Sequence, residues 1–140
     1  MIRLATLLVL LFLAAPAHAQ QDLDAAMQRV ARMWERGDVR GLTQSASGSG
    51  FALEFDSGRT GPVASRQAAA ALRRLFEDQQ TISVKPGVTR VSGGRPQRAF
   101  GELEWITRPR GTTIPERRTV FVALVREDRG WRVTEIRVMP

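Results

Sequence analysis

The C-terminal stretch of residues 119–139 constrains the fold more than any other part of the chain. Its first half is apolar at the six consecutive positions 120–125, which is typical of a central strand that is covered on both faces. A charged turn ending in Gly130 follows, and the second half, WRVTEIRVM, alternates apolar and polar residues. This stretch therefore predicts a β-hairpin at the centre of a sheet.

The alternation in the second half of this hairpin shifts by one residue. Trp131 and Val133 have one parity, whereas Ile136 and Val138 have the other. One extra residue bulged near positions 134–135 would keep all four side chains on one face and would bend the sheet. The sequence therefore predicts a curved sheet against which the rest of the chain packs.

The preceding residues supply the other elements. Periodicity and capping residues predict helices over 22–36, 39–45 and 66–78, and strands over 51–55, 81–91 and 98–107, with a loop at 58–62. Pro86 and Gly87 should interrupt their strand with a kink or a bulge. Helices first and a strand meander last indicate an α+β fold, with N-terminal helices packed on a strongly curved antiparallel sheet.

Residues 1–19 predict a secretory signal peptide. They contain one basic residue, Arg3, then a short apolar run, and then small residues at Ala17 and Ala19. The apolar run is too short for a transmembrane helix. We therefore expect cleavage near Ala19, a periplasmic or secreted protein, and a single domain over residues 20–140.

The composition excludes several catalytic chemistries. The only histidine, His18, lies in the predicted signal peptide, and the chain has no cysteine and no tyrosine. Without His or Cys, the mature protein cannot build a typical zinc, copper or haem site or a His-activated nucleophile. We expect no metal and no cofactor, and any catalysis would depend on Asp, Glu, Ser, Thr or the sole lysine, Lys85.

Positive charge is concentrated in the middle of the chain. The chain has 21 Lys and Arg against 14 Asp and Glu, a net charge of +7, and residues 85–118 alone contribute +5. An anionic partner such as a lipid headgroup, a polyanionic glycan or an acidic protein would explain this excess, and so would a solvated arginine-rich surface. No basic motif interleaved with aromatic residues is present, so we do not expect a nucleic-acid partner.

Three local patterns occur in a recognisable order. They are the helix-ending segment WERGDVRGL, the strand FALEF followed by a glycine turn and SRQA, and the closing strands with GWRV and IRV. In this order they resemble the nuclear-transport-factor-like (cystatin-like cone) superfamily, and in particular its small exported bacterial members of uncharacterised function. The resemblance covers residues 20–140 and implies a bent sheet wrapped on helices around a cone-shaped pocket. Enzymes of that superfamily use Asp, His or Tyr there, and this mature chain has neither His nor Tyr.

Aromatic residues and one arginine form the predicted binding site. The aromatic residues that could line an apolar pocket are Trp34, Phe76, Trp105, Phe121 and Trp131. Arg137 could bind the carboxylate or phosphate of a ligand. The alternatives are ordinary core packing for the aromatic residues and an ion pair with a nearby glutamate for Arg137.

Glu102 and Glu104 form a second candidate site because they lie two residues apart on one predicted strand. On a concave face they could support a carboxylate-only, isomerase- or hydratase-like enzyme, whereas on a solvent face opposite Leu103 and Trp105 they would have no such role.

We predict an exported, non-enzymatic domain that binds a small apolar or anionic ligand or a partner protein. That enzyme is the alternative, and a homodimer formed through the sheet is a third hypothesis.

Overall fold

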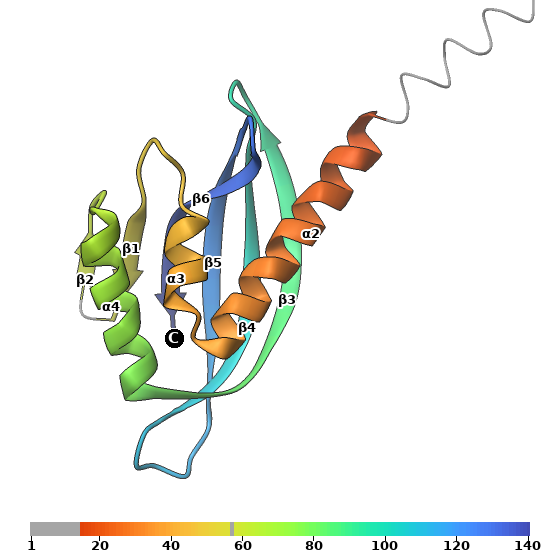
Figure 1. Cartoon of the computed structure of the whole chain (residues 1–140). Coiled ribbons are helices and arrows are strands. Elements are labelled where there is room, and N and C mark those ends of the chain that lie inside the picture. The colour runs from red at the N-terminus through yellow and green to blue at the C-terminus, as the bar shows by residue number, and fades with distance from the viewer. Residues whose placement is uncertain (1–14, 57) are drawn as a thin grey trace, which may run out of the picture.

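The computed structural model describes residues 15–56 and 58–140, which form helices on one face of a single sheet (Figure 1). The helices are α2 (Ala15–Arg36), α3 (Val39–Gln44) and α4 (Ser65–Asp78). The strands are β1 (Ala52–Phe55), β2 (Gly58–Thr60), β3 (Gln79–Gly93), β4 (Arg98–Pro109), β5 (Glu116–Glu127) and β6 (Gly130–Met139). The strand order in the sheet is β2-β1-β6-β5-β4-β3.

The sheet confirms the predicted α+β class and the central position of the C-terminal hairpin. Every pair of neighbouring strands is antiparallel except β1 and β6, which are parallel. The three helices cover the concave face, and the opposite face, which we call the outer face, carries no helix (Figure 1).

The predicted bulge in the closing hairpin is confirmed. Ala123 of β5 pairs with Glu135, but the next residue, Leu124, pairs with Val133, so Thr134 is the extra residue. Trp131, Val133, Ile136 and Val138 are consequently all buried on the helix side of the sheet. A bulge increases the local twist, and this one lies in the strand that joins β1 to the rest of the sheet.

A second irregularity bends the long edge strand β3. Its register against β4 shifts between Pro86 and Thr89, as the proline and glycine in the sequence predict. The strands β3 and β4 curve strongly, and α2 lies across them (Figure 1). This curvature encloses the apolar core between the helices and the concave face.

The junction between α2 and α3 is built from one glycine and one capping carboxylate. Gly37 has φ 62° and ends α2, and the backbone N–H of Asp38 donates to the carbonyl of Met33 at 2.8 Å. The Asp38 side chain then accepts a hydrogen bond from the backbone N–H of Gly41 at 2.9 Å, which caps α3. The break between the two helices agrees with the predicted ranges of 22–36 and 39–45.

The largest differences from the predicted elements are at residues 58–60 and at the start of α2. Residues 58–60 form the edge strand β2 rather than a loop, because they pair antiparallel with β1. Helix α2 begins at Ala15 and includes the predicted cleavage position, while most of the predicted signal peptide falls on residues 1–14, outside the described residues. No helix in the described part of the chain is long and apolar enough to cross a membrane.

Candidate functional site

The structure divides the predicted binding residues between the two faces of the sheet. Trp34, Phe76 and Trp105 meet on the concave side, with ring centroids 5.0 Å apart for Trp34 and Phe76 and 5.3 Å apart for Trp34 and Trp105. Trp34 and Trp105 have no exposed surface, so these rings fill the cone instead of lining an opening. Phe121 and Arg137 lie on the outer face, whereas Trp131 is buried on the helix side of β6. The six predicted residues therefore do not form one pocket.

Arg137 is engaged by its neighbours on the outer face. Its Nε donates a hydrogen bond to Glu135 and lies 3.6 Å from a carboxylate oxygen of Glu54. The hydrogen bond from Arg137 to Glu135, together with the charge of Glu135, raises the pKa of the Arg137 guanidinium. Its Cζ lies 5.5 Å from the ring centroid of Phe121, which stacks on Phe100. Arg137 thus makes the glutamate ion pair that was the alternative to a ligand contact.

Glu102 and Glu104 also lie on the outer face. They alternate along β4 with Leu103 and Trp105, which are fully buried on the concave side. Glu102 is exposed, and Glu104 lies 3.7 Å from Nε of Arg117. Neither glutamate faces the inside of the cone, where the carboxylate-only enzyme requires them.

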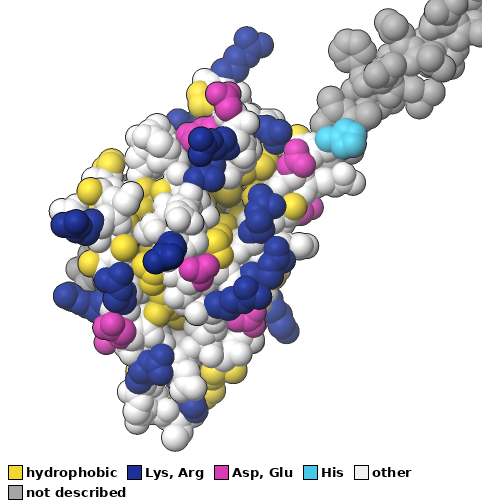
Figure 2. Space-filling model, in the orientation of Figure 1, with side chains coloured by type: hydrophobic (Ala, Val, Ile, Leu, Met, Phe, Trp, Pro, Cys, Tyr) yellow, Lys and Arg dark blue, Asp and Glu magenta, His cyan; other side chains and the backbone are white. Residues whose placement is uncertain are grey.

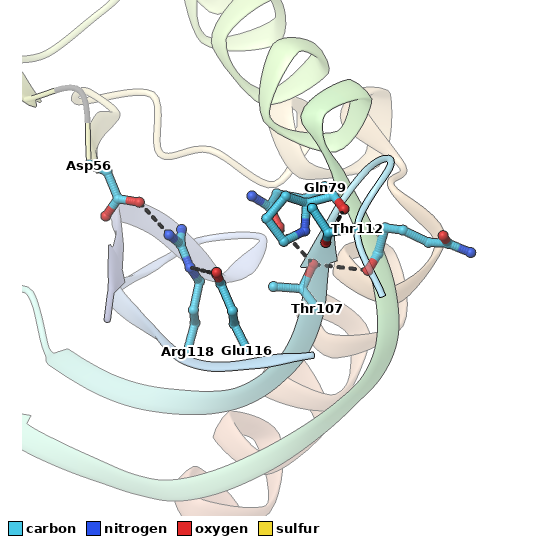
Figure 3. A network of polar contacts seen from close by, with 8 residues as sticks. Asp56, Gln79, Thr107, Thr112, Glu116 and Arg118 are labelled. Carbon is cyan, nitrogen blue, oxygen red and sulfur yellow. Dashed lines mark hydrogen bonds and ion pairs between the residues drawn. The ribbon is translucent and has the colours of Figure 1, made fainter. Parts of the chain in front are cut away.

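Two openings that border the helices have volumes of about 390 Å³ and about 300 Å³. The second lies within the curve of the sheet, between α4, β1 and the first residues of β3 and β5, and we call it the mouth pocket (Figure 3). Its apolar wall consists of Phe55, Ala71 and Leu75. Its polar wall consists of Asp56, Arg74, Asp78, Gln79 and Arg118.

Arg118 is the most enclosed cation of the mouth pocket. It shares the inward parity of the buried residues Val120 and Val122 on β5, and its side chain is only 15% exposed. Its Nη2 lies 2.5 Å from a carboxylate oxygen of Asp56, and its Nε lies 3.6 Å from Glu116 (Figure 3). A guanidinium held in this way can still offer N–H groups to a ligand, because it carries five donors.

Hydrogen bonds between β3 and β4 hold the side of the pocket that Gln79 lines. The hydroxyl of Thr107, a fully buried residue, donates to the carbonyl oxygen of Gln80 at 2.9 Å and lies 3.2 Å from the side-chain oxygen of Gln79 (Figure 3). These bonds fix the start of β3 against β4 and hold Gln79 at the rim. The two arginines and two aspartates of the lining balance, so the pocket has no net formal charge.

Arg118 and Asp56 were not among the predicted site residues. The alternation along β5 could have indicated Arg118, because Val120 and Val122, two and four residues after it in the strand, are buried. No local sequence pattern indicated Asp56, because its contact with Arg118 joins segments 62 residues apart. Among residues 15–56 and 58–140, no group of three or more His, Cys, Asp or Glu could hold a metal ion.

Solved structures place this architecture among known folds, although no family model and no curated protein sequence matches the chain. A DUF4783 family protein from Bacteroides uniformis superposes with a TM-score of 0.64 at 15% identity, covering 80% of this chain and 94% of that one. An NTF2-like protein with a cystatin-like fold from Novosphingobium aromaticivorans superposes with a TM-score of 0.65 at 16% identity, covering 90% and 86%. The fold is NTF2-like.

A further similar structure is that of an NTF2-like family protein. It comes from Streptomyces avermitilis, is described as a proposed dehydratase, and superposes with a TM-score of 0.67 at 12% identity, covering 89% of this chain and 97% of that one. At such low identities the NTF2-like resemblance defines the fold and leaves the activity to be argued from the residues of this chain.

Proposed function

We propose that this protein is an exported, non-enzymatic binding domain whose mouth pocket holds a small, largely apolar ligand with one anionic group. The observation that carries the proposal is the position of Arg118, a guanidinium only 15% exposed beside an apolar wall and an open volume of about 300 Å³. Ligand sites typically combine such an apolar lining with a few well-placed polar groups.

The ion pair between Arg118 and Asp56 would provide the specificity. Asp56 is 53% exposed, so it can return to water when a ligand carboxylate takes its place on the guanidinium. That exchange keeps Arg118 paired throughout, which avoids leaving an enclosed charge without a partner. The body of the ligand would lie against Phe55, Ala71 and Leu75.

The positions of the two candidate glutamates favour a binding role over the proposed carboxylate-only enzyme. Glu102 and Glu104, the carboxylates proposed for an isomerase- or hydratase-like reaction, are on the outer face. The inner aromatic cluster of Trp34, Phe76 and Trp105 is closed and carries no titratable group. A substrate in the mouth pocket would therefore lie away from both glutamates.

A protein partner or a homodimer would use the outer face. Phe100 and Phe121 stack there with ring centroids 5.8 Å apart, and no helix covers them (Figure 1). The homodimer remains a hypothesis that light scattering tests directly, since a clean monomer at high protein concentration contradicts it.

Two measurements test the proposal. Native mass spectrometry of the purified protein detects a ligand that co-purifies with it. A thermal-shift screen then compares small aromatic and aliphatic carboxylates. Ala71→Phe fills the mouth pocket, and Arg118→Gln removes its cation. Arg117→Gln is the matched control, because Arg117 belongs to the same strand but faces outward with its side chain 75% exposed.

The proposal predicts that the carboxylates which stabilise the native protein lose this effect in Ala71→Phe and Arg118→Gln and keep it in Arg117→Gln. A ligand whose stabilisation survives in Ala71→Phe binds elsewhere, and the mouth pocket would then not be the binding site. Catalytic turnover of such a ligand, abolished by Glu102→Gln or Glu104→Gln, would favour the enzyme alternative.

A further inference from the structure

A second cavity, of about 390 Å³, lies between α2, the start of α3 and the hairpin of β5 and β6. We call it the arginine cleft, because its polar lining includes Arg29, Arg32, Arg36, Arg129 and Arg132. It shares no lining residue with the mouth pocket. Five cations around one cavity are unusual, since like charges at close range repel one another.

The arginines of α2 are placed to act together. Arg29, Arg32 and Arg36 are spaced by three and four residues, so they lie along one side of the helix. Lys and Arg side chains gather over the lower half of α2 and near the top of β6, with hydrophobic side chains visible between them (Figure 2). Arg129 reaches the cleft from the hairpin turn on the opposite wall.

Among the described residues, four of these cations form no ion pair, although Glu127 and Asp128 share a neighbouring opening with Arg129 and Arg132. In the described part of the chain, neither the three arginines of α2 nor Arg129 has an ion-pair partner. Asp38, the acidic residue of the cleft, has its carboxylate engaged as the cap of α3. The lining therefore keeps a net charge of +4, from five arginines and one aspartate.

Arg132 has a different role, because it holds the cleft in shape. Its guanidinium donates to the backbone carbonyl of Gln44 and, at 3.3 Å, to that of Ala46. These bonds tie the end of α3 to β6, next to the bridge between Ala46 and Val133. The cleft consequently has one wall that is fixed before any ligand binds.

The floor of the cleft is apolar. It is formed by Val30, Met33, Leu124, Trp131 and Val133, from α2 and both strands of the hairpin. The indole N–H of Trp131 is buried and has no acceptor among the described residues. An apolar floor below a rim of arginines suits a molecule with an apolar body and a strongly anionic head.

From this geometry we propose that the arginine cleft binds a single amphipathic phosphate monoester. Arginine guanidinium groups match phosphate oxygens with paired hydrogen bonds, and a dianionic head balances more of the +4 charge than one carboxylate does. The floor lies between a helix and a hairpin and encloses about 390 Å³, a volume in the range of small-molecule sites, so the proposed occupant is one molecule and not a bilayer surface. This inference does not depend on the function proposed for the mouth pocket.

Calorimetric titration with short-chain phosphatidic acid, below its micelle-forming concentration, tests the proposal. Inorganic phosphate, the matching diacylglycerol and phosphatidylglycerol vesicles serve as parallel probes. The double variant Arg29→Gln/Arg129→Gln removes one cation from each wall. The control Arg66→Gln/Arg73→Gln removes the same charge from exposed positions of α4 outside the cleft.

We expect phosphatidic acid to bind more tightly than inorganic phosphate, and diacylglycerol not to bind. The cleft variant should weaken phosphatidic acid binding at least about tenfold, and the α4 control should change it less than about twofold. Arg29→Lys/Arg129→Lys should restore part of the affinity, because it keeps the charge but not the paired hydrogen bonds. Ala71→Phe should leave this binding unchanged, which separates the cleft from the mouth pocket.

Three results would overturn the proposal. They are no binding of phosphatidic acid by the native protein, an equal loss in the cleft variant and the α4 control, or binding to phosphatidylglycerol vesicles without binding to the soluble lipid. The last result would assign the arginines to a membrane surface instead of a single ligand.

Discussion

Arg117 and Arg118 are adjacent in the chain and lie on opposite faces of the sheet. The side chain of Arg117 is 75% exposed and lies 3.7 Å from Glu104, whereas that of Arg118 is 15% exposed and contacts Asp56. Alternation along β5 is the cause, because successive side chains of a strand point to opposite faces. The pair therefore offers a matched comparison between an enclosed and a solvated arginine.

Arg118→Gln should lower the free energy of unfolding by about 1–2 kcal/mol, since it removes charge-assisted bonds from an enclosed position. Arg117→Gln should lower it by less than about 0.5 kcal/mol, because its ion pair is exposed to solvent. Urea unfolding followed by circular dichroism measures both. Equal effects of the two substitutions would mean that Arg118 is no more enclosed in solution than Arg117.

Met27 packs against Gly101 and leaves no room for a side chain there. A Cβ added at Gly101 would lie 2.7 Å from Cε and 2.9 Å from Sδ of Met27, a residue without exposed surface. Gly101→Ala should therefore destabilise the protein by about 1–3 kcal/mol, because the buried thioether must move.

The background Met27→Ala provides the control for this contact. Met27→Ala alone should cost about 2–5 kcal/mol, but adding Gly101→Ala to it should cost nothing or stabilise the strand slightly. Urea unfolding of the four proteins gives the coupling energy between the two positions. If Gly101→Ala has the same cost in both backgrounds, Met27 is not the reason for a glycine at this position.

The two fully buried tryptophans of the aromatic cluster differ in one hydrogen bond. Nε1 of Trp105 donates to the hydroxyl of Thr81 at 3.0 Å, whereas Nε1 of Trp34 has no acceptor among the described residues. Trp105→Phe should therefore be more destabilising than Trp34→Phe, by about 1 kcal/mol, because only the former breaks a bond. Thr81→Val should cost a similar amount. Chemical denaturation of the three variants measures these differences, and a larger cost for Trp34→Phe would contradict the assignment.

The elements that the sequence predicted well are those with local signals. The glycine and aspartate between α2 and α3, the Pro86 kink and the bulge at Thr134 all follow from the residues at those positions. The edge strand β2 and the parallel pairing of β1 with β6 were not predicted. Their cause is distant, since β1 pairs with residues about 80 positions later in the chain.

The binding site was harder to predict, because the aromatic residues were grouped by type without regard to the face of the sheet on which each one lies. Phe121 is aromatic like Trp105, but it pairs with Glu102 on the outer face, whereas Trp105 lies opposite Arg118 on the concave face. The parity that buries Val120 and Val122 also turns Arg118 inward. The arginine cleft had no local signal, because it joins α2 to a hairpin turn about 100 residues away.

The bulge at Thr134 allows a decisive test of how the sheet is specified. Deleting Thr134 would force β6 to lose either Trp131 and Val133 or Ile136 and Val138 from the core, because a shift of one residue reverses the faces of a strand. The deletion should cost more than about 4 kcal/mol and abolish cooperative unfolding, whereas Thr134→Ala should cost less than about 1 kcal/mol. Thermal and urea unfolding monitored by circular dichroism compare the two variants. A deletion variant that still unfolds cooperatively with nearly native stability would show that β6 tolerates a second register, and that the bulge does not determine which side chains fill the cone.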